Sequence, residues 1–191
     1  PPNFHIDGNY EQTVEKSIHE QVKILPKLVH QLDYPTSGVM MLGLNRKAAA
    51  RASKEFQQRK TTKIYLALVL GDVNSQSISA PIADDKEDYK QFKMKVDPAG
   101  LVAETEVTRI QYIQEQNITL VRLKPKQGRR HQLRVHMLYI GSKIIGDMTY
   151  GTELDDFQDC DEKRLCLHAA YLKNDAIEVE LIAKQCDFIE K

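Results

Sequence analysis

Apolar and polar positions fall into successive blocks in the first half of the chain. Residues 39–44 are almost all apolar and follow a proline and a glycine, which is typical of a short buried strand. Asn45 is a favourable helix N-cap, and the Ala-rich residues 46–58 after it suit a helix. Residues 63–70 are apolar, β-branched and aromatic, and the run stops at a glycine. The order strand, helix, strand predicts a β-α-β unit.

The second half of the chain has mainly the pattern of strands. Residues 73–100 are polar and contain prolines, which predicts a long loop or hairpin. Residues 102–113 and 118–123 alternate between apolar and polar positions, as antiparallel strands with one buried face do. Apolar residues at helical spacing within residues 130–139, followed by a glycine, predict a short helix. Two more strands are predicted at residues 165–172 and 176–182. The fold class that follows is α+β, with a mixed, largely antiparallel sheet and flanking helices.

Length and composition limit the class of protein. The 191 residues, 41% apolar and 28% charged, suit one soluble domain or a tightly joined pair, and we expect a single domain over residues 1–191. No apolar stretch approaches the roughly 20 residues that cross a bilayer, so no membrane partner is expected. Cys160, Cys166 and Cys186 form no CxxC pair, which predicts no zinc site or disulfide and an intracellular, reducing compartment such as cytoplasm, nucleus or mitochondrion.

The charged residues are unevenly distributed. The formal net charge is zero, from 27 basic and 27 acidic residues, which by itself argues against a nucleic-acid partner. However, residues 117–146 carry many basic side chains and no acid, and residues 46–63 form a second basic run. The compensating acids cluster at residues 84–88 and 153–162. A basic face opposed by acidic loops is compatible with this pattern, although charge runs are also common on ordinary solvated surfaces.

Motifs for the commoner chemistries are absent from the sequence. It has no phosphate-binding Gly-rich loop, GxSxG, HExxH or GxGxxG motif, so most hydrolase and nucleotide-binding classes lose support. Three local clusters of polar residues remain as candidates. They lie at residues 30–38 (HQLDYPTSG), 63–65 (KIY) and 128–136 (GRRHQLRVH).

Asp33 is the candidate acid of the first cluster. The Tyr34-Pro35 step keeps the chain extended, so the acid is expected on a turn that presents its carboxylate beside a strand. Thr36 and Ser37 can offer hydroxyl or main-chain donors that would orient the ionised carboxylate. The competing interpretation is an Asx-turn that shapes the loop and has no chemical role.

The arginines of the third cluster need an anionic partner. On a helix, Arg130 and Arg134 share one face, where two like charges repel. RNA phosphate and the Asp33 carboxylate are candidate partners, and Arg129 at the helix start could serve the same phosphate. A plain exposed basic helix end is the alternative interpretation.

The aromatic and imidazole side chains of these clusters have structural explanations as well. His131 and His136 are expected to be hydrogen-bonded structural histidines, because no carboxylate or cysteine stands beside them at metal-ligand spacing. Tyr65 lies within an apolar strand, where an aromatic residue normally belongs to the core. Spacing alone does not choose between these explanations and a site.

In this order, the three clusters resemble the motifs of the RluA-type RNA pseudouridine synthase family, and in particular its RNA pseudouridylate synthase domain-containing subgroup. The resemblance spans most of residues 28–172. It rests on His30-x-Leu32-Asp33-x-x-Thr36-Ser37-Gly38, on Lys63-x-Tyr65 with Ala67, Val69 and Gly71, on Gly128-Arg129-x-His131-Gln132-Leu133-Arg134-Val135-His136 with Gly141, Gly146-Asp147 and Tyr150-Gly151, and on Leu167-His168-Ala169.

The resemblance implies a reaction and a set of roles. The family isomerises uridine to pseudouridine in RNA without metal or organic cofactor. By resemblance, Asp33 is the essential carboxylate, Tyr65 packs on the uracil and can assist removal of the C5 proton, and Arg134 pairs with Asp33. Leu167 would line the base pocket. Residues expected to contact the substrate are His30, Gln31, Thr36, Arg129, Arg130 and His131. A monomer that acts on tRNA or rRNA is expected.

The sequence departs from the family pattern at two places. Gln31 stands where the family usually has arginine, and glutamine can donate hydrogen bonds but supplies no charge. The strand that normally precedes residues 6–8 is missing, so we expect the core to lack its first N-terminal strand. These departures leave open a catalytically silent RNA-binding relative. A small-molecule enzyme or a plain interaction domain is the third possibility, and it would show salt-insensitive RNA binding or none.

Overall fold

The computed structural model describes residues 1–151 and 164–184, which divide into two compact units. The first unit contains residues 1–63 and 169–184, and the second contains residues 64–168 apart from the undescribed stretch. The single domain expected over residues 1–191 stays a prediction. The predicted acid cluster at residues 153–162, with Cys160, and Cys186 lie outside the described residues. Cys166 is a buried free cysteine.

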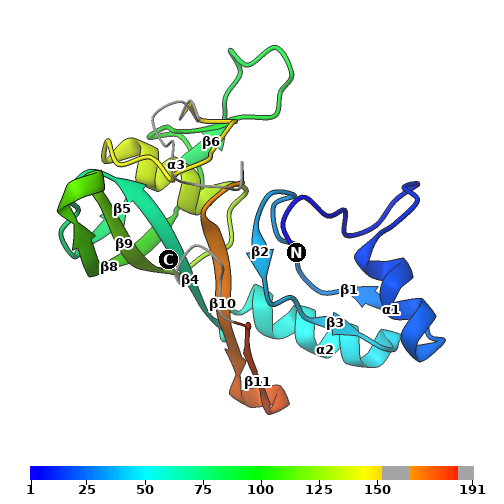
Figure 1. Cartoon of the computed structure of the whole chain (residues 1–191). Helices are drawn as coiled ribbons and strands as arrows, with labels where there is room; N and C mark the ends of the chain where they lie inside the picture. Colours follow the sequence, from blue (N-terminus) through cyan, green and yellow to red (C-terminus); the bar gives the residue numbers. More distant parts are fainter. Residues whose placement is uncertain (152–163, 185–191) are drawn as a thin grey trace. The chain divides into compact units, whose positions relative to one another are not determined.

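In the first unit, the helix α2 (Arg46–Gln57) lies along the antiparallel pair of β1 (Lys27–Leu28) and β3 (Leu42–Gly43) (Figure 1). The Asn45 side chain accepts the main-chain N–H of Ala48 at 2.8 Å, so the predicted N-cap is confirmed. The elements in chain order are α1 (Val14–Val22), β1 (Lys27–Leu28), β2 (Ser37–Gly38), β3 (Leu42–Gly43) and α2 (Arg46–Gln57). The later part of the unit contains β10 (Leu167–Asn174) from residue 169 onward, the 3-10 turn η3 (Asp175–Ile177) and β11 (Val179–Ile182).

The apolar residues 39–44 form much less strand than their composition predicts. Only β3 is a strand, and it pairs with β1 in a separate two-stranded sheet that does not include β4. Met41 instead packs with Ala52 of α2 and Leu172 of β10 in the core of this unit. The β-α-β interpretation is therefore wrong, because these side chains are buried against a helix and not within a shared parallel sheet.

Gly38 is required by the close approach of β2 to β10. Its φ is +117°, and a Cβ at this position would collide with the main-chain carbonyl of Ala169. The N–H of the next residue, Val39, donates to that same carbonyl at 2.8 Å. Any side chain at residue 38 would push the two strands apart, which explains a glycine at the end of the first polar cluster.

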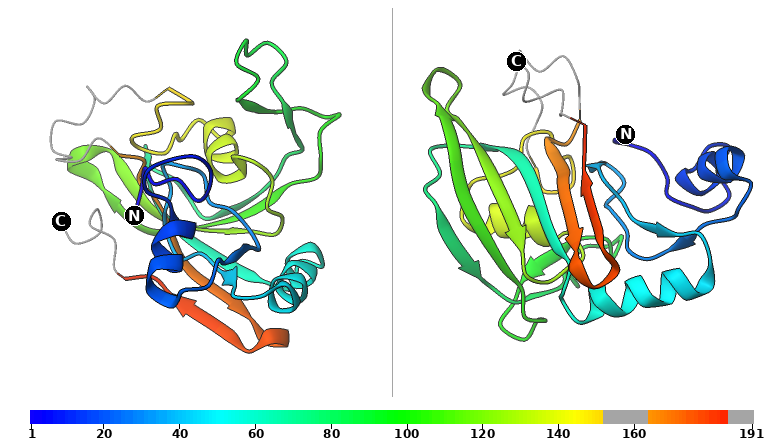
Figure 2. Two further views of the ribbon diagram at one scale, coloured as in Figure 1. Left: turned by 90° about the vertical axis from the view of Figure 1, so that its right-hand side faces the viewer. Right: turned by 90° about the horizontal axis from the view of Figure 1, so that it is seen from below.

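The second unit is an antiparallel sheet with the strand order β5-β8-β9-β4. Leu133 and Met137 of α3 (Gln132–Tyr139) pack on Val121 and Leu123 of β9 (Ile118–Pro125), so α3 covers one face of the curved sheet (Figure 2). The elements are β4 (Thr62–Leu70), β5 (Gln76–Ser79), β6 (Ile82–Asp84), β7 (Met94–Val96), β8 (Glu104–Ile113), the 3-10 turn η1 (Gln114–Gln116), β9 (Ile118–Pro125) and α3 (Gln132–Tyr139).

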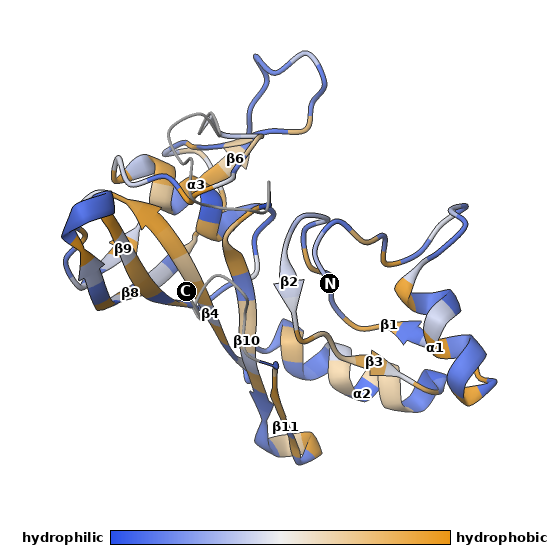
Figure 3. Cartoon of the chain, viewed as in Figure 1, coloured by the Kyte–Doolittle hydropathy of each residue, from blue (hydrophilic) through white to orange (hydrophobic). Residues whose placement is uncertain are grey.

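Residues 73–100 contain more strand than their polar composition indicates. The predicted hairpin is present, since β6 pairs antiparallel with β7, and the loop between them is strongly hydrophilic (Figure 3). The additional strand β5 pairs with β8 and buries only Ile78. With one buried side chain, this strand has no periodic signal that a sequence pattern could detect.

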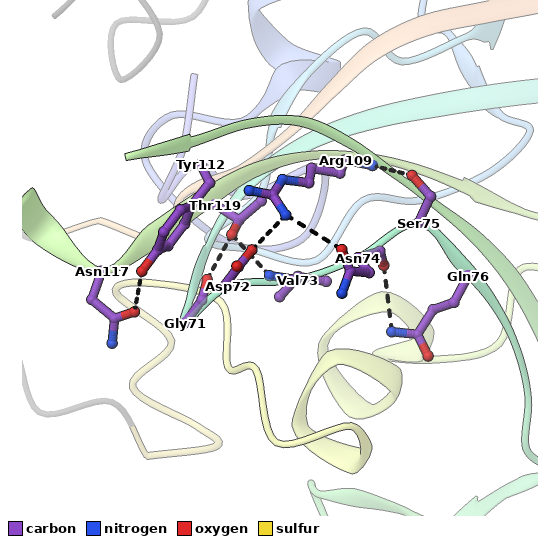
Figure 4. Close-up of polar contacts among 10 residues, drawn as sticks. All are labelled: Gly71, Asp72, Val73, Asn74, Ser75, Gln76, Arg109, Tyr112, Asn117 and Thr119. Atoms are coloured by element: carbon purple, nitrogen blue, oxygen red, sulfur yellow. Dashed lines mark hydrogen bonds and ion pairs between the residues drawn. The ribbon is translucent and has the colours of Figure 1, made fainter. Parts of the chain in front are cut away.

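Arg109 of β8 ties the β4–β5 connection to the sheet (Figure 4). Its guanidinium lies 2.6 Å from the Asp72 carboxylate and 3.3 Å from the Asn74 side-chain oxygen. The Thr119 hydroxyl donates to the Gly71 carbonyl at 2.6 Å and accepts the N–H of Val73 at 3.1 Å. This polar network satisfies main-chain groups of a tight connection, so we assign it a structural role.

The predicted α+β class is confirmed. Every strand pairing with an assigned register is antiparallel, and the helices are few and short. Within residues 1–151 and 164–184, none of the helices has the length and apolar character to cross a bilayer.

Candidate active site

Asp33 lies in a tight turn of the first unit. The Thr36 N–H donates to the Asp33 main-chain carbonyl at 2.8 Å, which closes the turn through Tyr34 and Pro35. The Asp33 side chain is half-buried, while Tyr34 is exposed. The Thr36 hydroxyl is buried and has no hydrogen-bond partner among the described residues, so the expected donation from this hydroxyl to Asp33 is wrong. The turn is closed by this main-chain hydrogen bond.

His30 fastens the loop that carries Asp33. Its Nε2 accepts the N–H of Met41 at 2.9 Å, and its ring stacks on Phe56 of α2 with centroids 4.6 Å apart. Burial and the nearby Lys63 ammonium lower the pKa of His30 to about 4, against a smaller opposing effect of a main-chain hydrogen bond with Gln31. His30 is therefore neutral near pH 7, and its hydrogen bond with Met41 joins the two ends of the loop formed by residues 31–40. Its role in contacting RNA stays a prediction.

Two motif residues near His30, Gln31 and Lys63, differ in exposure. Gln31 is exposed, as a side chain that reaches for a substrate must be. Lys63 is half-buried at the start of β4, and burial lowers its pKa. Because Lys63 disfavours a second positive charge nearby, it helps to keep His30 neutral.

Tyr65 and Leu167 lie against the core of the second unit. Tyr65 is half-buried in β4, opposite Leu123 of β9 in the antiparallel register, and packs on the core cluster. Leu167 is buried in the same cluster at the start of β10. The core explanation of Tyr65 thus accounts for part of its ring, and the predicted contacts of both residues with uracil stay predictions.

Arg134 is held in the second unit by Asp147. Its Nε donates to Asp147 Oδ2 at 2.7 Å and its Nη2 donates to Oδ1 at 2.6 Å, and the two side chains are only 1% and 2% exposed. Asp147 Oδ1 also accepts the N–H groups of Thr149 and Tyr150, at 3.0 and 3.2 Å. A bidentate pair in the interior fixes both the charge and the orientation of the guanidinium.

Asp147 is a functional candidate that sequence reasoning missed. The signal was present, because Gly146-Asp147 belongs to the stretch that resembles the family, but nothing in the sequence paired this acid with Arg134. The bidentate contact uses two of the five guanidinium N–H donors. The predicted pairing of Arg134 with Asp33 stays a prediction.

The expectation that Arg130 and Arg134 share one helical face is wrong. The helix α3 begins at Gln132, and His131 before it has a left-handed φ of +53°, so Arg130 lies outside the helix. Arg130 Nη2 donates to the Phe92 carbonyl at 2.6 Å, and its guanidinium lies 4.9 Å from the centre of the Phe92 ring. Gly128, Arg129 and Arg130 therefore belong to the loop before α3, and Arg130 contacts the loop between β6 and β7.

His131 and His136 make the hydrogen bonds expected of structural histidines, and the predicted contact of His131 with the substrate stays a prediction. The Tyr150 hydroxyl accepts the N–H of Met94 at 2.9 Å, so its own proton is available for His131 Nδ1 at 2.8 Å. His136 Nε2 contacts the Ala80 carbonyl at 2.9 Å, and burial lowers the pKa of His136. Within the described part of the chain, no group of three or more His, Cys, Asp or Glu side chains is placed to hold a metal ion.

The acid-free stretch 117–146 does not form an unopposed basic face. Lys124 and Lys126 of β9 lie 3.7 and 2.8 Å from Glu106 and Glu104 of β8, which are their neighbours across the antiparallel pair. Arg129 Nε donates to the Val102 carbonyl at 3.1 Å. Acids distant in sequence thus face Lys124 and Lys126, which a one-dimensional charge pattern cannot reveal.

The structure thus describes an α+β protein with antiparallel strand pairs, an acid, Asp33, in a tight turn, and a buried arginine, Arg134, paired with Asp147. The chain matches the family model for RNA pseudouridylate synthase over residues 3–139, and it belongs to this family. The resemblance to RluA-type enzymes is therefore confirmed.

Curated relatives and a solved structure support this assignment. The chain is 41% identical over 131 residues to "Ribosomal large subunit pseudouridine synthase D" of Borreliella burgdorferi, which covers 68% of this chain and 39% of that protein. It is 37% identical over 155 residues to "RNA pseudouridylate synthase domain-containing protein 1" of Danio rerio, covering 76% and 52% of the two chains. The structure of human RNA pseudouridylate synthase domain containing 1 matches with a TM-score of 0.79 and 31% identity, over 96% of this chain and 78% of that one. The chain spans about half the length, or less, of these two curated relatives.

Proposed function

We propose that this chain isomerises uridine to pseudouridine in RNA. The observation that carries the proposal is its membership of the RNA pseudouridylate synthase family over residues 3–139, a range that contains Asp33, Tyr65 and Arg134. The relatives named for this reaction in ribosomal RNA support the same substrate class. We infer that the RNA is tRNA or rRNA and that the enzyme acts as a monomer.

The reaction requires no external reagent. The C1′–N1 glycosidic bond breaks and a C1′–C5 bond forms, while C5 loses its proton to solvent and N1 gains one. Atoms and electrons balance within the nucleotide, so the reaction needs neither a redox cofactor nor a co-substrate. The enzyme must extract the base from its stack, hold it while it rotates, and manage charge at the sugar and the base.

Each of the three side chains has a role compatible with its surroundings. The Asp33 carboxylate on its turn can attack C1′ or C6 or remove a ribose proton, and each of these roles requires the ionised form. Tyr65 offers a ring that the uracil can pack on and a hydroxyl that can assist loss of the C5 proton. Arg134, fixed by Asp147, supplies a permanent positive charge that can keep Asp33 ionised.

Loss of the C5 proton provides the decisive experiment. RNA labelled with 5-tritiated uridine is incubated with the parent chain and with Asp33→Asn, and released tritium is measured. We expect release by the parent and a loss of at least about 100-fold in the variant, the scale of removing a catalytic acid–base group. Asp84→Asn, at an exposed acid at the end of β6, is the matched control and should behave as the parent.

The experiment also separates the competing functions. If neither the parent nor the control releases tritium while RNA binding persists, the chain is a catalytically silent RNA-binding relative and the enzyme proposal fails. Equal release by the parent and Asp33→Asn would leave the reaction in place but remove Asp33 from its assigned role.

A further inference from the structure

Three aromatic rings form a cluster at the turn that carries Asp33. The His5 ring lies parallel to that of Tyr10, with centroids 3.4 Å apart and planes inclined by 5°. His5 also contacts Tyr34, whose ring is tilted by 43° with its centroid 4.6 Å from that of His5. Tyr34 follows Asp33 directly in the turn. We call His5, Tyr10 and Tyr34 the aromatic platform.

Main-chain contacts hold the platform in place. The N–H of Asn3 donates to the Tyr34 carbonyl at 2.9 Å, which ties the N-terminal segment to the Asp33 turn. The His5 carbonyl accepts the N–H of Val14 at 3.0 Å, at the start of α1. Gly8, with φ +97°, reverses the chain so that Tyr10 returns onto His5. The rings are therefore organised before any ligand arrives, which lowers the entropic cost of binding.

The platform is open to solvent although it is strongly aromatic. Tyr10 is 49% and Tyr34 is 48% exposed. Rings that served only to fill a core would be covered, whereas exposed preorganised rings next to the essential acid of an RNA enzyme offer a face for a nucleobase. An unpaired base next to a flipped nucleotide has lost its own stacking partner and gains by taking a ring in its place.

We propose that the aromatic platform stacks an unpaired nucleobase of the substrate RNA beside the target uridine. This inference rests on the proposed function and deepens it, because it selects RNA in which the target lies in a loop and not within continuous duplex. Tyr34 contributes the ring next to Asp33, Tyr10 contributes a second exposed ring, and His5 contacts both. The platform residues position the RNA and do not touch the reacting atoms.

The charges around the platform indicate stacking and not phosphate attraction. The same segment carries the acids Asp7, Glu11 and Glu15 against one nearby lysine, Lys16. Binding here should therefore depend little on ionic strength. Loss of a platform ring is expected to lower RNA affinity without changing the slope of log affinity against log salt, because no phosphate contact is removed.

The test uses a fluorescein-labelled RNA stem–loop with a uridine loop, and copies in which 2-aminopurine replaces one loop base at a time. The fluorescence of 2-aminopurine falls when it stacks on an aromatic ring. The parent should quench at one loop position, and Tyr34→Leu and Tyr10→Leu should abolish that quenching and raise the dissociation constant about tenfold, the scale of one base–aromatic stack. Tyr34→Phe should show the quenching and the dissociation constant of the parent, since it keeps the ring.

A cycle with abasic RNA separates stacking from a structural effect. If the loop base at the quenched position is removed, Tyr34→Leu should have no further effect on affinity. Tyr139→Leu, an equally simple change at an exposed tyrosine at the end of α3, is the control and should leave quenching and affinity unchanged. Far-ultraviolet circular dichroism confirms that each variant is folded.

The outcomes are distinguishable from failure of the proposed function. Tritium release by the parent with quenching that survives both leucine variants, or with no quenching at any loop position, would overturn the platform and leave the enzyme proposal standing. Full additivity between Tyr34→Leu and the abasic change would overturn it as well. Absence of tritium release from the parent would instead refute the enzyme, whatever the quenching.

Discussion

Protonation of His30 should weaken the fold of the first unit, and the effect can be isolated by a single substitution. The unfolded chain binds a proton at His30 with a pKa of 6.5, whereas the folded chain binds it only at about 4. Between these values the unfolded state carries more protons, so the free energy of unfolding falls as the pH falls. The contribution is complete above pH 6.5 and is lost by about pH 4.

The magnitude follows from the difference between the two pKa values. The span from 6.5 to about 4, at about 1.4 kcal/mol per pH unit, amounts to about 3 kcal/mol of unfolding free energy. The main cause of the lowered pKa is burial, which disfavours the imidazolium, and Lys63 adds repulsion. A proton on Nε2 would in addition face the N–H of Met41, 2.9 Å away. The imidazolium would also lose water on the face that is stacked on Phe56.

The variant His30→Phe keeps an aromatic ring for Phe56 and removes the titrating group. Near pH 7 it should be less stable than the parent by about 1–3 kcal/mol, because the N–H of Met41 loses its acceptor. Near pH 4 the difference should vanish, because the parent has by then lost the contribution of His30. Urea denaturation followed by circular dichroism measures both values. The control His19→Phe, at an exposed position of α1, should leave the pH profile of the parent unchanged.

A constant stability difference between the parent and His30→Phe from pH 7 to pH 4 would refute this reasoning. It would mean that His30 is protonated as easily in the folded state as in the unfolded state, and that the contact with Met41 does not depend on the neutral ring. Loss of catalytic rate in His30→Phe at unchanged RNA affinity would show in addition that the loop position of Asp33 depends on this contact.

Two further substitutions test the anchors of the candidate site, each against a matched control. Asp147→Asn should destabilise the chain by about 3 kcal/mol or more, measured by urea denaturation, because it removes the buried carboxylate that forms two hydrogen bonds with Arg134. Asp72→Asn, in a partly exposed pair, should cost about 1 kcal/mol or less, and equal costs for the two variants would contradict the assignment. Gly38→Ala should lower the melting temperature well below that of Gly71→Ala, which has a similar left-handed requirement but open space around it; similar values would show that β2 and β10 tolerate a side chain.

The strands and helices with a clear period were predictable from sequence, and those without one were not. Alternation located β8 and β9, because burial alternates along much of both strands. Helical spacing with a terminal glycine located α3, although six consecutive residues of this helix, from Gln132 to Met137, are buried. The strand β5 buries one residue and so has no strong period. The β-α-β interpretation was wrong for a related reason, since a short apolar run indicates burial but not the partner that buries it.

The candidate site was predictable as residue types and not as contacts. The sequence placed Asp33 on a turn before a strand, and the structure closes that turn between main-chain groups. It did not identify Asp147 as the partner of Arg134, or the Met41 N–H as the partner of His30. Such pairings join residues 11 and 13 positions apart, and no period or local propensity encodes them.

The pairing of charges changes what the motifs imply about RNA binding. In the third motif, Arg134 is matched by Asp147, and the guanidinium of Arg130 faces the Phe92 carbonyl. His30 is neutral near pH 7 because its pKa is lowered to about 4. A count of basic residues in the motifs therefore overstates the charge that is available to phosphate. It follows that RNA affinity should rise less steeply at low salt than the motif sequence indicates, and that specific stacking must supply more of the binding free energy.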